Sequence, residues 1–381
     1  MVYITVPLNE QLVKQLTFEE MCFGSLDAQN EYRKNLTNNT RTFKTDAVPD
    51  KYLARFNIQA LINSLALFNS TTASLREVPR ASLYHSYKIP KAKGGWRPID
   101  EPLPDLMLAL DNLSKIFQIE FKALHHTSAF AYAKKRSTYH AVQRHQFNES
   151  KWFGKFDLHN FFGSTTFDFA MRMLSIIFPF SEVMKNPQGE RELRTAVELG
   201  FLNGGLPQGS PFSPCFTNIL MIPFDYEFSK VVRQFNKQTF VYTRYADDMQ
   251  ISSKYEFKAR DIEQLIRDTL ALFDAPYTIN REKTRYGSSA FSNWILGYQL
   301  NAQNEITVGH ERKHKVAKDL FNYAMDRKTP CPWTYPEIKK LDGDLAYIKH
   351  VEPEYTKRML ARISKKCGFD IERAIKADTK A

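Results

Sequence analysis

The stretch "YTRYADDMQIS", Tyr242–Ser252, decides the fold, because it sets two adjacent acids, Asp247 and Asp248, between apolar and β-branched residues. The pattern over residues 239–254 predicts two strands joined by a tight turn that carries both acids. Two carboxylates about 4 Å apart repel each other by roughly 4 kcal/mol at an intermediate dielectric. Taken alone, the acidic pair is typical of a solvated surface turn, where Asp is common. A metal ion that removes the repulsion is the alternative.

A third acid ends another predicted strand. The apolar run in "KWFGKFDLHNFFGS", residues 151–164, stops at Asp157. If the two strands pair, Asp157 converges with Asp247 and Asp248 at one end of a sheet. Such oxygen ligands suit two Mg²⁺ ions. Metal ions about 3.5–4 Å apart can activate an attacking hydroxyl and stabilise a leaving pyrophosphate. By itself, Asp157 is also an ordinary strand-end residue, so the surrounding segments have to decide.

Strand and helix patterns alternate through the middle of the chain, which predicts an α+β fold with helices on either side of a palm-like sheet. Strands are expected within 83–102 (two strands around a basic turn), 151–157, 239–254 and 293–309 (a hairpin). Helices are expected over most of 1–80, from Asp105 to about Leu124, as one long helix within 210–235, over 261–273 and beyond Gly309.

Composition indicates a polyanionic partner. Lys and Arg number 53 against 42 Asp and Glu, a net charge of +11, which favours nucleic acid. The 43% hydrophobic content excludes wholesale disorder. The four cysteines form no C-x-x-C pair, which fits a reducing compartment without a zinc site. Neither a signal peptide nor an apolar stretch near the ~20 residues of a membrane span is found, so we expect a cytoplasmic protein with no membrane partner.

Six segments, taken in order, resemble the motifs of reverse transcriptases. They are "YKIPKAKGGWRPIDEP", "FDLHNFF", "GLPQGSPFSPCFTN", "YADD", "KTRYG" and "WILGYQL", within about Leu83 to Gly309. The resemblance implies an RNA-directed DNA polymerase with the right-hand fold: fingers, a palm made of an antiparallel sheet backed by helices, and a helical thumb. It also implies two Mg²⁺ ions, with Mn²⁺ as a substitute. The domains expected are a helical extension (1–80), fingers (81–156), palm (157–300, with a primer-grip hairpin at 293–309) and thumb (310–381).

The resemblance also implies roles for individual residues at the chemical centre. Asp157 and Asp247 would be the principal metal ligands, Asp248 would complete the acidic cluster, and Leu158 would lend its carbonyl. Lys283 resembles the family lysine near the leaving pyrophosphate, where it would act as a general acid. Without that context, Lys283 would be a surface charge.

Further residues are expected to bind the incoming nucleotide. Arg97 would fork onto the triphosphate, as guanidinium geometry permits. Lys91 or Lys93 would neutralise the γ-phosphate, and the length of the loop leaves the choice open. Either lysine is otherwise an exposed loop charge. Gly209 would let the backbone approach the nucleotide closely, and Gln208 would bond to its sugar or base.

Phe162 matches the aromatic steric gate of reverse transcriptases. A phenyl ring cannot hydrogen-bond a ribose 2′-OH and leaves little room for it, so dNTPs would be preferred over rNTPs. RNA-dependent RNA polymerases, which share the acids, typically carry a polar residue there. The alternative is that Phe161 and Phe162 are both core residues, but strand alternation would turn them to opposite faces.

The remaining expected contacts are to nucleic acid. The small residue Ala246 would leave room for the primer's 3′ end, and the "WILGYQL" segment would grip the primer. Basic residues of the thumb would track the backbone of RNA or a hybrid, with a solvated helix face as the alternative. The expected contacts are Tyr245, Ala246, Trp294, Gly297, Lys313 and Lys315.

About seventy residues follow Gly309, enough for a thumb and little else, so the chain resembles compact bacterial enzymes: retron and defence-associated ("unknown group") reverse transcriptases. "AYAKKRSTYHAVQRH" is similar to a retron segment, but Ala141 and His145 stand one residue further apart than in retrons. Ile295, Leu296 and Gly297 likewise replace the retron Val-Thr-Gly. These departures favour the defence-associated group.

Membership of that group would imply a structured non-coding RNA as template, an RNA/DNA hybrid product and a role in stopping phage infection. Three alternatives stay open: a retron enzyme making RNA-linked single-stranded DNA, a template-independent or protein-primed DNA polymerase, and a non-catalytic RNA-binding scaffold. An effector protein and a homo-oligomer are further partners left open. The sequence does not identify the RNA or the priming hydroxyl.

Overall fold

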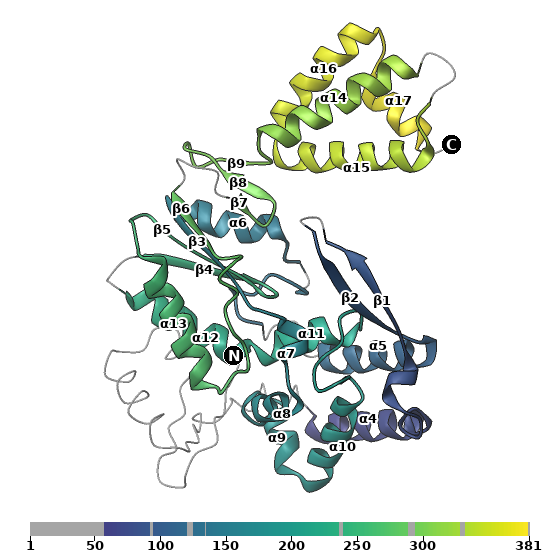
Figure 1. The fold of residues 1–381 in the computed structure, drawn as a ribbon, viewed down its shortest axis with the longest axis vertical. Coiled ribbons are helices and arrows are strands. Elements are labelled where there is room, and N and C mark those ends of the chain that lie inside the picture. Colours follow the sequence, from purple (N-terminus) through teal and green to yellow (C-terminus); the bar gives the residue numbers. More distant parts are fainter. Residues whose placement is uncertain are drawn as a thin grey trace. The chain divides into compact units, whose positions relative to one another are not determined.

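The computed structural model describes residues 57–91, 94–119, 125–133, 135–235, 239–288, 294–327 and 332–379. These form two compact units (Figure 1). The first unit takes in the chain up to Ser137 together with Gly154–Tyr286, and the second takes in Thr138–Phe153 together with the chain from Gly287 onward. The helix predicted over residues 1–56 lies outside the described residues, whereas 58–71 of the predicted extension are helical.

A four-stranded sheet carries the acids, in the order β4-β5-β3-β6. Its strands are β3 (Trp152–Asp157), β4 (Phe240–Tyr245), β5 (Asp248–Ser253) and β6 (Arg285–Ser288). The antiparallel pairing of β4 with β5 confirms the predicted hairpin, with Tyr245 opposite Asp248. The turn, however, consists of Ala246 and Asp247, so Asp248 is the first residue of β5 and not part of the turn.

Helices back this sheet, as predicted. Helix α12 (Ile222–Gln234) contacts β4 and packs against α13 (Ala259–Leu272) (Figure 1). The single long helix predicted within 210–235 is wrong: α11 (Phe212–Leu220) ends before α12 begins. The break follows from Pro223 in the first turn of α12, because proline has no N–H to donate and its ring clashes with the preceding turn.

A separate hairpin precedes the sheet. Strands β1 (Tyr84–Pro90) and β2 (Trp96–Pro102) pair antiparallel, as predicted, with Ile89 opposite Arg97. Gly94 and Gly95 both have positive φ (89° and 82°) in the connecting turn, which closes through a 2.9 Å bond from the Lys91 N–H to the Gly95 carbonyl. Of the candidate phosphate-binding lysines, Lys93 lies outside the described residues.

Further helices of the first unit enclose an aromatic core. They are α4 (Ile58–Thr71), α5 (Pro104–Ile119), α7 (Phe161–Ser164), α8 (Phe167–Ile176), α9 (Phe180–Lys185) and α10 (Pro187–Glu198), with 3₁₀ turns η1 (Ala73–Arg76) and η2 (Arg80–Leu83). Phe117 of α5 stacks on Phe180 at 4.6 Å between ring centroids and meets Phe212 edge-on at 5.4 Å. This core fastens α5 and α9 to α11, whose preceding loop is part of the candidate site.

The second unit combines a small sheet with helices. It contains α6 (Thr138–Phe147), β7 (Trp294–Ile295), β8 (Tyr298–Leu300), β9 (Ile306–Thr307), α14 (His310–Asp326), α15 (Tyr335–Val351), α16 (Pro353–Cys367) and α17 (Ile371–Asp378). The helices beyond Gly309 are as predicted, but the predicted hairpin is a three-stranded sheet. Leu320, Tyr323 and Ile348 are fully buried in its core. Within the part of the chain that the structure describes, no helix is both long and apolar enough to cross a membrane.

Candidate active site

The three predicted acids meet where β3 ends beside the β4–β5 turn. The Leu158 N–H, just past Asp157, donates to the Asp247 carbonyl at 3.1 Å, which fastens the turn to the end of β3. Ala246 adopts a left-handed conformation (φ 57°) that lets the chain reverse within two residues. The Asp157 side chain is only 4% exposed, so its charge is largely withdrawn from water.

A lysine faces Asp157 from a neighbouring loop. The Asn280 N–H donates to the Asp157 carbonyl at 2.7 Å, and the His159 N–H donates to the Thr278 carbonyl at 2.8 Å. These bonds hold the loop that carries Lys283 along the end of β3. The Lys283 Nζ consequently lies 2.8 Å from Asp157 Oδ1 and 3.0 Å from Oδ2. The structure therefore brings Lys283 to the acids, where the sequence motif placed it.

A second lysine, which the sequence analysis missed, faces Asp248. The Lys155 Nζ lies 2.8 Å from both carboxylate oxygens of Asp248. Lys155 precedes Asp157 by two residues on β3, so both side chains leave the same face of the strand. That spacing was the available signal, but it became meaningful only once β5 was known to neighbour β3.

The electrostatics of the cluster show incompletely compensated negative charge. Burial, followed by repulsion from Asp157 and Asp248, raises the pKa of Asp247 to about 6. Burial also raises the pKa of Asp248, although Lys155 opposes this. Asp157 Oδ1 and Asp248 Oδ1 are buried and accept no hydrogen bond of proper geometry, although each is within ion-pair distance of an ammonium group. Two lysines, Lys155 and Lys283, thus pair with a cluster of three acids.

The three carboxylates do not converge on one common point in this structure. Among the described residues, no three acidic, imidazole or thiol side chains are gathered tightly enough to hold a metal ion. Their chemistry nevertheless fits a hard divalent cation, because carboxylate oxygens are its preferred ligands and two of them are buried without a hydrogen bond.

The loop that contains Gln208 and Gly209 is fastened to β2. The Asp100 N–H of β2 donates to the Gln208 carbonyl at 2.8 Å. Gly209 has φ 128°, and a Cβ there would stand 2.8 Å from the Asp100 carbonyl oxygen. The close approach at Gly209 that the structure contains is to the backbone of β2, and the predicted approach to the nucleotide stays a prediction. Arg97 lies on β2 and is exposed.

Phe161 and Phe162 do not belong to a strand. Asn160 takes a left-handed conformation (φ 44°), and the two phenylalanines begin the short helix α7. The argument from strand alternation was therefore wrong. The two rings lie 5.7 Å apart between centroids but differ in burial: Phe161 is buried against Tyr277 at 5.0 Å between centroids, and Phe162 is half-buried.

The predicted primer-grip residues lie in the second unit. Trp294 is in β7, and Leu296 and Gly297 form the two-residue turn to β8, both with positive φ (51° and 90°). Such a pair of positive φ values is typical of a tight hairpin turn, which explains the glycine. The Tyr347 hydroxyl donates to the Gly297 carbonyl at 3.4 Å, so this turn is tied to α15.

Of the two predicted basic contacts, Lys315 is exposed on α14 but Lys313 is not an open charge. The Lys313 Nζ lies 2.9 Å from Glu352 Oε2, 3.1 Å from the Thr307 hydroxyl and 4.9 Å from the Tyr355 ring centroid. Glu352 also accepts from the Val308 N–H at 2.9 Å. Lys313 therefore joins β9 to the start of α16, and its predicted nucleic-acid contact stays a prediction.

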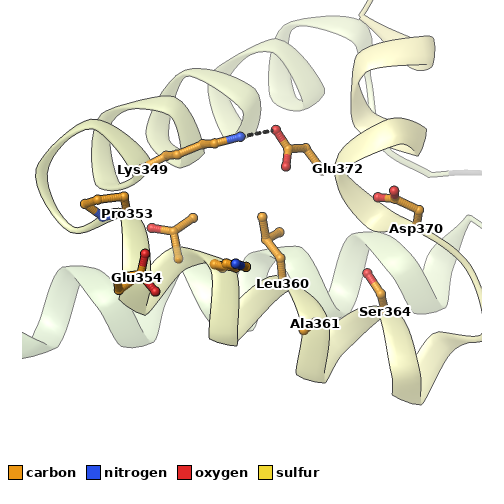
Figure 2. Close-up of a pocket in the computed structure, with 10 residues that line it drawn as sticks. Lys349, Pro353, Glu354, Leu360, Ala361, Ser364, Asp370 and Glu372 are labelled. Atoms are coloured by element: carbon orange, nitrogen blue, oxygen red, sulfur yellow. Dashed lines mark hydrogen bonds and ion pairs between the residues drawn. The ribbon is translucent and has the colours of Figure 1, made fainter.

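The second unit also contains a cavity of about 590 Å³ between α15, α16 and α17 (Figure 2). Lys349 and Glu372 form a 2.6 Å ion pair along one edge of it, and Asp370 is a further lining residue. None of the candidate site residues lines this cavity. Because its acidic and basic groups are mixed, its charge selects no class of ligand.

Comparison with known proteins gives one family. Residues 89–308 match the family model described as "Reverse transcriptase (RNA-dependent DNA polymerase)". The chain is 28% identical over 300 residues to the retron Ec83 reverse transcriptase of Escherichia coli, covering 78% of this chain and 90% of that protein. It is 26% identical over 309 residues to the retron Ec73 reverse transcriptase of the same organism, covering 79% and 93%. A solved structure of Candida albicans telomerase with a fragment of telomeric RNA is 12% identical, with a TM-score of 0.45, over 82% of this chain and 64% of that one.

Proposed function

Because this chain belongs to the reverse transcriptase (RNA-dependent DNA polymerase) family, we propose that its DNA synthesis takes place at Asp157, Asp247 and Asp248 with two Mg²⁺ ions. The observation that carries this proposal is the bond from the Leu158 N–H to the Asp247 carbonyl, which sets the turn acid beside the strand acid. The raised pKa of Asp247, caused by burial and by its acidic neighbours, supports it, because the cluster has a surplus of negative charge that cations would relieve.

The metal ligands proposed are Asp157 and Asp247, with Asp248 completing the cluster and the Leu158 carbonyl as a further donor. When bound, Mg²⁺ would lower the pKa of the primer hydroxyl and offset charge on the leaving pyrophosphate, with Mn²⁺ as a substitute. Lys283, whose Nζ is 2.8 Å from Asp157 Oδ1, is 58% exposed and can present its proton to a departing oxyanion.

The nucleotide would be held by residues from β1, β2 and the following loops. Arg97, with Lys91 or Lys93, would neutralise the triphosphate. Gln208 would contact the sugar or base, supported by its carbonyl bond to β2. Phe162, half-buried beside the buried Phe161, would exclude a ribose 2′-OH and so select dNTPs.

Further residues would contact the nucleic-acid strands. Tyr245 and Ala246 flank the acids and would meet the primer's 3′ end. Trp294 and Gly297 would grip the primer, and Lys315 would contact backbone phosphate. We propose the domain limits 1–80, 81–156 (fingers), 157–300 (palm, with the primer grip at 293–309) and 310–381 (thumb).

We further propose a dedicated structured non-coding RNA as template and a role in anti-phage defence, in the cytoplasm. A retron-type reaction that yields RNA-linked single-stranded DNA is the second candidate. It is favoured by the similarity to the Ec83 and Ec73 retron enzymes over at least 90% of their lengths.

The test is to purify the protein with its co-bound RNA and to add Mg²⁺ and labelled dNTPs. The expected product is DNA complementary to that RNA, absent from the double variant Asp247→Ala, Asp248→Ala and retained in Asp268→Ala, an exposed acid of α13. RNase digestion of the product separates the two candidates, because only a retron-type product stays joined to RNA. Synthesis from rNTPs, or homopolymer made without a template, would contradict the proposal.

A further inference from the structure

Arg244, the residue before Tyr245 in β4, carries a buried positive charge that has no part in the proposed reaction. The side chains of Arg244 and Asp225 are both 0% exposed. Arg244 Nε donates to Asp225 Oδ1 at 2.8 Å and Nη2 donates to Oδ2 at 2.6 Å, a two-pronged pair. The Tyr242 hydroxyl donates to Asp225 Oδ1 at 2.7 Å. Asp225 lies in α12 and Arg244 in β4, so the pair joins helix to hairpin.

The remaining donors of this guanidinium reach the catalytic turn and α11. Arg244 Nη1 donates to the Ala246 carbonyl at 3.1 Å. Its Nη2 also donates to Asn218 Oδ1 at 2.9 Å, and Asn218 Nδ2 in turn donates to the Ala131 carbonyl at 3.1 Å. Asn218 is itself 2% exposed, so the whole arrangement is shielded from water.

A buried ion pair adds little to the stability of a fold, because an apolar pair of similar volume often stabilises the protein equally or more. Lysine would bring three donors in place of the five that arginine presents in a planar fork. Arginine is therefore suited to a task that needs two fixed directions at once. Here one direction is towards Asp225 and the other is towards the Ala246 carbonyl.

The position of the Ala246 carbonyl affects the orientation of Asp247. Ala246 has φ 57°, a conformation that residues other than glycine, asparagine and aspartate rarely adopt. Its carbonyl belongs to the peptide that leads directly into Asp247. Fixing that peptide plane fixes the direction in which Asp247 leaves the turn.

We propose that Arg244 is a positioning residue for catalysis, with Asp225 and Asn218 holding its guanidinium so that it clamps the Ala246 carbonyl and aims Asp247. This inference rests on the proposed role of Asp247 in the reaction. The requirement is geometric: the turn has to present its carboxylate in one orientation.

The test compares Arg244→Lys with a matched control, Tyr242→Phe, by primer extension on RNA with the whole 381-residue chain. Arg244→Lys keeps a cation beside Asp225 but cannot fork to the turn, so kcat should fall at least tenfold while the Kd for primer–template stays within twofold. Tyr242→Phe removes a hydrogen bond from the same carboxylate without touching the turn, so kcat should stay within about threefold of wild type.

A rescue variant separates aiming from mere folding. Glycine adopts the left-handed conformation without a second group to hold it. The kcat of the double variant Arg244→Lys, Ala246→Gly should therefore be at least threefold higher than the kcat of Arg244→Lys. The effect of Ala246→Gly on the wild-type kcat is measured as the baseline. A gain in kcat larger than this baseline effect supports the proposal that Arg244 orients Asp247. Absence of recovery, or equal kcat losses in Arg244→Lys and Tyr242→Phe, overturns the proposal.

Two further variants keep the outcome decisive. If Arg244→Lys does not fold, Asn218→Ala removes the second acceptor of Arg244 Nη2 and leaves the pair with Asp225 intact. This variant should lose more kcat than Tyr242→Phe; an equal or smaller loss overturns the proposal. Asp247→Ala tests the premise separately. Full activity in Asp247→Ala would remove the proposed role of that acid, whereas an inactive Asp247→Ala with a normal Arg244→Lys would remove only the positioning role.

Discussion

Replacement of Gly209 by alanine should loosen the loop that holds Gln208. Gly209 has φ 128°, where side chains other than hydrogen are strained, and the new Cβ would stand 2.8 Å from the Asp100 carbonyl oxygen and 3.1 Å from Ile99 Cγ2. The oxygen belongs to the backbone of β2 and cannot move away alone. The loop has to retreat, and the bond from the Asp100 N–H to the Gln208 carbonyl is then lost.

The magnitude follows from two contributions. A backbone held in a sparsely populated conformation costs about 1–3 kcal/mol, and a lost internal hydrogen bond costs about 0.5–1.5 kcal/mol. Gly209→Ala should therefore lower the free energy of unfolding by about 1.5–4.5 kcal/mol. Gly204→Ala is the matched control, because Gly204 also has positive φ (82°) but a Cβ there meets no atom within 4 Å. It should cost about 1–2 kcal/mol, from strain alone.

Urea unfolding followed by circular dichroism measures both variants, and steady-state primer extension gives the dNTP KM. We expect Gly209→Ala to raise that KM about tenfold or more, equivalent to roughly 1.4 kcal/mol of binding, and Gly204→Ala to change it less than twofold. Equal destabilisation by the two substitutions would refute the contact with β2. A destabilised Gly209→Ala enzyme with an unchanged KM would refute the role of the loop in holding the nucleotide.

Three other predictions concern separate parts of the molecule. Phe162→Ala should increase rNTP incorporation relative to dNTP, measured by single-nucleotide extension, and an unchanged ratio would mean that another residue is the gate. Lys283→Met should lower kcat about 10²-fold, in the range of lost general-acid catalysis, and Lys283→Arg should recover part of it; full activity in Lys283→Met would leave the ion pair with Asp157 without a catalytic role. Burial pushes the pKa of Glu352 up, but bonds from Lys313 and its other donors outweigh this and lower that pKa. A lowered pKa contributes stability that is present above the unfolded value near 4.5 and lost as pH falls through the folded value. Glu352→Gln should therefore lower the free energy of unfolding at pH 6 by about 1.5–3 kcal/mol and by progressively less below pH 4.5, and a pH-independent difference would contradict the ion pair.

The part of the fold that the sequence predicts well is the part that local patterns encode. The strand ending at Asp157 and the hairpin around Asp247 follow from apolar alternation and turn residues within a dozen positions. The division of residues 210–235 into two helices also had a local signal, Pro223, which the continuous apolar pattern obscured. Phe162 was assigned to a strand because nothing in the sequence announced the left-handed Asn160 that starts a helix there.

The site contacts that could not be predicted depend on which segments meet in three dimensions. Lys155 faces Asp248 only because β3 lies next to β5. The sequence assigned no role to Arg244, and only its complete burial against Asp225 points to one. For Lys313, charge alone predicted a phosphate contact, whereas the fold supplies Glu352 at 2.9 Å. A basic residue can therefore be assigned to nucleic acid only after its acidic neighbours are known.

The most direct measurement is extension of a DNA primer on a defined RNA template by the purified chain, with Mg²⁺ and the four dNTPs, comparing wild type with Asp157→Asn and Asp268→Asn. Asp157 is nearly buried and paired with Lys283, whereas Asp268 is exposed on α13. We expect template-complementary DNA from wild type and Asp268→Asn, and at least a 10³-fold slower reaction from Asp157→Asn, a loss equivalent to about 4 kcal/mol of transition-state stabilisation. Extension by Asp157→Asn at the wild-type rate would contradict the assignment of the chemistry to this acidic cluster.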